Sequence, residues 1–65
     1  MPISRDIDPA AIETLRDAIS VSGLSIREFA DRVLVRDQRT IRRWLAGDRP
    51  IPEVVVGKCR ELIAA

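Results

Sequence analysis

The sequence from Asp37 to Gly47 reads DQRTIRRWLAG and has the pattern of a short helix with two different sides. Ile41, Trp44 and Leu45 are spaced i, i+3, i+4, so they share one side and can enter a core. The other side carries Gln38, Arg39, Arg42 and Arg43. A solvated helix surface can have this pattern. It also suits a helix in the DNA major groove, where Arg pairs with guanine and Gln with adenine.

The segment before this helix predicts a second helix over about residues 26–34. Ser25 and Glu28 have the spacing of a capping box, with Ser at the N-cap and Glu three residues later. Phe29, Ala30 and Val33 form its apolar stripe. A short turn then leads to Asp37, which we expect to be the N-cap of the arginine-rich helix, and Gly47 ends that helix.

Two further helices flank this pair. Asp8 and Pro9 are a typical helix start, and Gly23 is a typical stop, so a first helix is predicted over roughly 9–22. After a proline-rich turn, residues 52–65 are predicted to form a C-terminal helix. The sequence has no strand pattern and no repeat, so we expect an all-α fold of four helices, with residues 1–7 as a loose N-terminal arm.

Length and composition limit what the chain can be. With 65 residues it forms one small domain, which buries little surface and commonly needs additional support. One Cys and no His exclude an internal disulfide and a zinc site, so we expect oligomerisation to supply the support and no metal or cofactor to be bound. No apolar run approaches membrane-spanning length, so a cytoplasmic location is expected.

The net charge of +1 hides an uneven distribution. Residues 24–49 carry seven arginines against four acidic residues, whereas residues 1–23 carry two basic and four acidic groups. The positive charge is therefore concentrated around the two-sided helix. Such a basic region is typical of nucleic-acid binding.

The second and third predicted helices are joined by about three residues, which is the spacing of a helix-turn-helix unit. The segment Leu24–Pro52, LSIREFADRVLVRDQRTIRRWLAGDRPIP, resembles the DNA-binding core of Cro/cI-type (Xre-like) repressors. The shared features are a small residue in helix two and the residues around helix three, namely Ala30, Val35, Thr40, Ile41, Trp44 and Gly47. The resemblance implies a lambda-repressor-like fold with residues 24–47 as its helix-turn-helix unit. Its size, its turn and its Arg-Pro-x-Pro exit are also similar to small regulators tied to phage and anti-CRISPR operons.

The sequence departs from the family pattern at the turn. The family usually has Gly where this chain has Leu34, and here one residue more than usual separates Ala30 from Ile41. Either the turn is longer or helix two continues past Val33. The family often has a phosphate-clamping Gln where this chain has Ile26, so we expect that contact from Arg27 or from the backbone amides at the start of the helix.

We assign functional residues on this basis. The DNA base contacts are expected from Gln38, Arg39, Arg42 and Arg43. The phosphate contacts are expected from Ser25, Arg27, Arg36, Thr40 and Arg49. A homodimer interface is expected from Ile51, Val54, Val55, Lys58 and Leu62. Trp44 and Cys59 are interpreted as core residues.

These assignments predict a transcriptional repressor that binds a palindromic double-stranded DNA operator as a homodimer and acts on a nearby or its own operon. The alternative is a protein-interaction module, such as an antitoxin or adaptor. No catalytic role is expected, because the chain has no His, no Tyr, no nucleophile–base pair and no phosphate-binding glycine loop. We expect neither a membrane nor a small molecule as partner.

Overall fold

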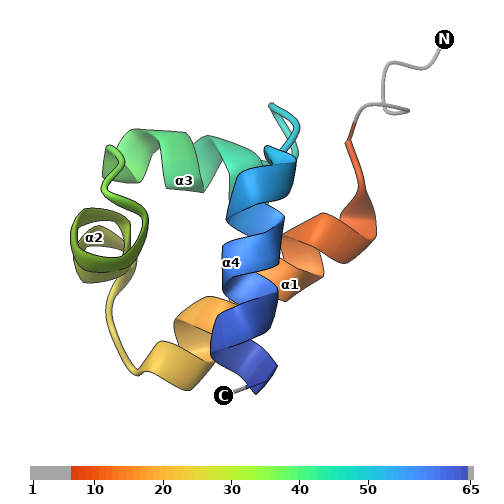
Figure 1. The fold of residues 1–65 in the computed structure, drawn as a ribbon. Helices are drawn as coiled ribbons and strands as arrows, with labels where there is room; N and C mark the ends of the chain where they lie inside the picture. The colour runs from red at the N-terminus through yellow and green to blue at the C-terminus, as the bar shows by residue number, and fades with distance from the viewer. Residues whose placement is uncertain (1–6, 65) are drawn as a thin grey trace, which may run out of the picture.

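The computed structural model describes residues 7–64, which form four helices and no strand (Figure 1). Helix α1 spans Pro9–Ser22, α2 spans Ile26–Phe29, α3 spans Gln38–Ala46 and α4 spans Glu53–Ala64. A π-helical segment, η2 (Ala30–Leu34), continues α2 without a break. The all-α fold of four helices predicted from the sequence is confirmed. The proposed N-terminal arm lies outside the described residues except for Ile7, as does Ala65.

The predicted helix starts are confirmed by side-chain caps. The Asp8 carboxylate accepts a hydrogen bond from the Ala10 amide at 3.0 Å, and Asp37 accepts one from the Arg39 amide at the same distance. Ser25 accepts from the Glu28 amide at 3.1 Å, which closes the predicted capping box. Each cap satisfies a backbone N–H that the first turn leaves without a partner.

The predicted ends of the first and third helices are also confirmed. Gly23 and Gly47 take left-handed conformations, with φ of 73° and 81°, directly after α1 and α3. The start of α4 differs by one residue from the prediction, because Pro52 precedes the helix and its carbonyl accepts from the Val55 and Val56 amides.

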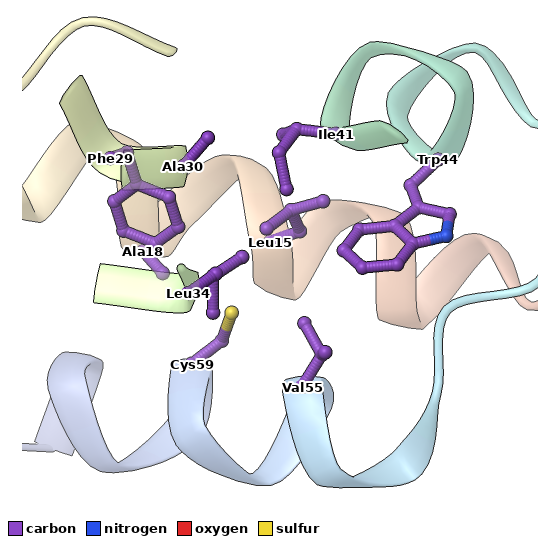
Figure 2. Close-up of a cluster of buried hydrophobic side chains, with 9 residues drawn as sticks. All are labelled: Leu15, Ala18, Phe29, Ala30, Leu34, Ile41, Trp44, Val55 and Cys59. Carbon is purple, nitrogen blue, oxygen red and sulfur yellow. The ribbon is translucent and has the colours of Figure 1, made fainter. Parts of the chain in front are cut away.

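One apolar core holds the four helices together (Figure 2). Leu15 from α1 and Ile41 from α3 lie at its centre with almost no exposed surface. Trp44 is 4% exposed and Cys59 is fully buried, so both are core residues as predicted. The remaining members of this cluster are Ala18, Phe29, Ala30, Leu34 and Val55.

The turn after helix two accommodates the extra residue in an unusual way. Leu34 remains helical and buried, and the left-handed residue is Val35, with φ 52° and ψ 51°. The amides of Val35 and Arg36 both donate to the Ala30 carbonyl, the latter at 2.8 Å. These wide hydrogen-bonded rings contain one residue more than an α-helical end would. Of the two alternatives, helix two therefore continues past Val33.

Candidate nucleic-acid interface

Helix α3 presents two chemically opposite sides. Ile41 and Trp44 are buried against the core, whereas Arg39, Arg42 and Arg43 are all exposed. Helical geometry puts Arg39 at the middle of the outward side, with Arg42 and Arg43 beside it. We call Gln38, Arg39, Arg42 and Arg43 the arginine face. Gln38 is half-buried at its edge.

The guanidinium groups of the arginine face have no carboxylate within ion-pair distance among the described residues. Among the described residues, the one ion pair joins Arg32 to Glu28, at 4.0 Å on the outer side of helix two. Arg39 and Arg43 are spaced i, i+4, where like charges repel each other. This side of α3 therefore carries positive charge that internal contacts within residues 7–64 do not neutralise.

A hollow of about 380 Å³ adjoins the start of α3. It is lined by Arg27, Glu28, Asp31, Arg32, Arg36, Asp37 and Gln38. The structure thus brings the proposed phosphate-contacting residues Arg27 and Arg36 together with Gln38 of the arginine face. The hollow holds three arginines and three acidic residues, so it has no net charge of its own. The positive excess lies on the outward side of α3.

The three acidic residues in this hollow were not part of the predicted site. Asp37 was predicted as a helix cap, and its carboxylate does cap α3. Glu28 belongs to the capping box, and Asp31 is exposed. The sequence did indicate that Glu28 lies beside Arg32, because residues spaced i, i+4 share one side of a helix.

The other predicted phosphate contacts are spread more widely. Ser25 lies before α2, where its hydroxyl is already used in the capping box with Glu28. Thr40 is half-buried in α3. Arg49 is exposed in the turn that follows α3, so along the chain it lies at the opposite end of that helix from Arg36.

The predicted dimer residues divide into two groups. Val54 is 80% exposed and Lys58 is also exposed, so both are available to a partner. Ile51 and Leu62 are half-buried against the core. Val55 is 3% exposed inside the core of the single chain, so it has almost no surface to offer a partner. Its role is to anchor α4, because Val55 and Cys59 are spaced i, i+4 on the inward side of that helix.

Burial determines the chemistry of Cys59. The side chain has no exposed surface, and this burial raises the pKa of the thiol. A buried neutral thiol is a weak nucleophile. Residues 7–64 also bring together no cluster of His, Cys, Asp or Glu that could hold a metal ion. None of the helices in this range has the length and apolar character needed to cross a membrane.

Comparisons of the chain with models of protein families, with curated proteins and with solved structures found no match.

Proposed function

We propose that this chain binds double-stranded DNA sequence-specifically and represses transcription of a nearby operon or of its own, as a homodimer on a palindromic site. The observation that carries the proposal is the arginine face. Its three exposed guanidiniums have no carboxylate within ion-pair distance among the described residues. In the major groove, Arg donates two parallel hydrogen bonds to guanine, and such pairs supply much of the discrimination between bases.

The relation between α2 and α3 supports placing α3 in the groove. In Figure 1, α2 is seen almost end-on while α3 runs across the view, so the two helices cross steeply. Three residues, 35–37, separate η2 from α3. A steep crossing with a short connection is the geometry of a helix-turn-helix unit. We therefore interpret α3 as the recognition helix of a lambda-repressor-like domain.

The charges around α3 suggest how the domain would be positioned. Arg27 and Arg36 border the hollow at the start of α3, and Arg49 follows its end. Arginines at both ends of a recognition helix can bind phosphates on either side of the groove. Such phosphate contacts fix the orientation on DNA, and base contacts from the arginine face then supply the specificity.

We propose a homodimer because one such domain contacts too few base pairs to specify a site by itself. A nine-residue helix offers few base contacts. Two copies related by a two-fold axis double these contacts and read a palindrome whose half-sites lie about one helical turn apart. We place the partner surface on the C-terminal helix α4, which has exposed residues on more than one of its sides.

The proposal can be tested by selecting bound sequences from a pool of random duplexes and then measuring affinity by fluorescence anisotropy over a range of salt concentrations. We expect an enriched palindromic sequence that binds at least about 10³-fold more tightly than unrelated duplex. The logarithm of the affinity should fall steeply with the logarithm of salt, by about 0.9 for each phosphate contact.

The same measurement separates this function from its rival. A protein-interaction module would enrich no sequence and would show no steep salt dependence with duplex DNA. That result would contradict the proposed function. A promoter upstream of the chain's own gene is the natural second probe, since specific binding there would support autoregulation.

A further inference from the structure

A second hollow, of about 470 Å³, lies between the start of α1 and the outer side of α4. These two helices are in contact, and α4 passes in front of α1 in Figure 1. Ala11, Ile51 and Val56 supply apolar surface in this hollow, and Glu53 and Arg60 supply opposite charges from α4. Asp8, the N-cap of α1, adds a second carboxylate at the α1 side of the hollow. We call this hollow the α1–α4 groove. It is separate from the arginine face, because it contains no residue of α3.

Gly57 lies in the middle of α4 and lines the groove. Glycine is among the least favourable residues inside a helix. A Cβ atom added at this position would meet no atom within 4 Å, so internal packing does not require glycine here. The missing side chain leaves open space above the helix backbone. A second helix could approach closely at that point.

The two charges that α4 contributes to the groove complement themselves under two-fold symmetry. Glu53 and Arg60 are seven residues apart, so they lie on the same side of α4, about 10.5 Å apart along its axis. Both are exposed, and neither forms an ion pair among the described residues. Their spacing along α4 is too long for them to reach each other directly. Each therefore carries a charge that no ion pair within residues 7–64 neutralises.

We propose that a second copy of this chain occupies the groove, with its α4 antiparallel to the first and the two-fold axis passing between Val56 and Gly57. In that arrangement Glu53 faces Arg60 of the other copy, and Arg60 faces Glu53. Val56 lies over the open space at Gly57 of the other copy. All four residues lie on one side of the helix, as an interface between identical surfaces requires.

This interface deepens the proposed homodimer and differs from the surface expected from the sequence. Val54 and Lys58 do not line the groove and lie on another side of α4. Ile51 belongs to both sets. The proposal rests on self-association but not on DNA binding, so its test contains no DNA and its failure would leave DNA recognition untouched.

The test is sedimentation equilibrium of the full chain from micromolar to millimolar concentration. The wild type should dimerise. Arg60→Glu and Glu53→Arg should each weaken the dimer by about tenfold or more, because each places like charges opposite each other twice across the axis. The double variant should restore the dimer, because it exchanges the two charges without changing their pairing. Gly57→Leu should weaken the dimer similarly while helical circular dichroism is retained.

Lys58→Glu is the matched control, since it reverses one charge on α4 outside the groove and should leave the dimer unchanged. A dimer that is broken by Lys58→Glu but not by Arg60→Glu would overturn the proposal and place the partner on the other side of α4. A wild type that stays monomeric throughout would overturn it as well, as would a double variant as weak as either single one.

Discussion

The backbone of Val35 takes a left-handed conformation, with φ 52° and ψ 51°. For a β-branched residue this is a rare and strained state, and the left-handed region costs roughly 1–2 kcal/mol for residues other than glycine. The other two positive φ values in residues 7–64 belong to Gly23 and Gly47, which also end helices. The Val35 side chain is 78% exposed, so burial does not offset its strain.

Relief of this strain should stabilise the fold. Val35→Asn should raise the free energy of unfolding by about 1 kcal/mol, because Asn tolerates the left-handed region and the exposed valine side chain buries little apolar surface. Chemical denaturation measures the change. Val54→Asn is the control, since Val54 is 80% exposed but lies in α4, and it should give no gain. Equal effects of the two substitutions would show that the gain is not caused by backbone strain.

Trp44 should matter to stability and only indirectly to DNA binding. It is 4% exposed among Ile41, Leu15 and Val55 in the core. Trp44→Ala should reduce stability by roughly 3–5 kcal/mol, which is most of what so small a domain possesses. Thermal unfolding followed by circular dichroism measures this. A variant that melts normally yet no longer binds DNA would instead place the indole at the DNA surface.

Cys59 should make stability depend on alkaline pH. Burial raises the pKa of its thiol above the ordinary value of 9.0 that it regains on unfolding. The folded chain therefore favours the neutral thiol. The contribution of this preference to the free energy of unfolding is complete below pH 9 and is lost as the pH rises through the raised pKa. Denaturant midpoints of Cys59→Ala should show a weaker loss above pH 9 than those of the wild type. Parallel losses would exclude the thiol as the cause.

At the scale of the elements, the helix boundaries could be predicted because local chemistry sets them. Asp8, Ser25 and Asp37 each bond to an amide that the first helical turn leaves free, and glycine ends α1 and α3. These signals act over three or four residues, so they can be read directly from the sequence. The arginine face follows in the same way from helical spacing.

The π-helical segment could not be predicted, because it depends on contacts between residues that are far apart in the sequence. Leu34 is buried and α3 begins at Gln38, so the end of helix two and residues 35–37 together must span the distance between these two positions. The chain widens the end of helix two and places the strain at Val35. Tertiary packing decides that choice. Burial likewise assigns Val55 to the core, although its helical spacing was equally compatible with an interface.

Substitutions on the arginine face of α3 should change sequence specificity, whereas substitutions of phosphate-contacting residues should not. Arg39→Ala or Arg42→Ala should each cost about 1–3 kcal/mol on the selected sequence and relax specificity at one base pair in each half-site. Anisotropy titrations with the selected duplex and with single-base variants measure both effects. Unchanged binding by both variants would show that this side of α3 does not face the groove.

Arg27 and Arg49 provide the comparison, since they lie before and after α3 rather than on it. Arg27→Ala or Arg49→Ala should weaken binding to all sequences alike and reduce the salt slope by about one for each phosphate that is no longer neutralised. A weakening confined to one sequence would show instead that these arginines read bases.

At the scale of the whole molecule, the core is small enough that association would add appreciably to the stability of the fold. Ten apolar side chains, two of them on α4, are buried in the described part of the chain. A domain of this size is marginal by itself, so pairing through α4 would stabilise the folded form by mass action. The midpoint of thermal unfolding should then depend on protein concentration.

For a folded dimer that unfolds to two chains, each tenfold rise in concentration favours the dimer by about 1.4 kcal/mol. The melting temperature of the wild type should rise by about 5 °C per tenfold increase in concentration, given the usual entropy of unfolding per residue. Arg60→Glu should melt at a lower temperature than the wild type at each concentration, because its dimer is weaker. Lys58→Glu should behave like the wild type. Calorimetry over a hundredfold range of concentration measures all three, and a wild-type melting temperature that is constant over this range would contradict an association that stabilises the fold.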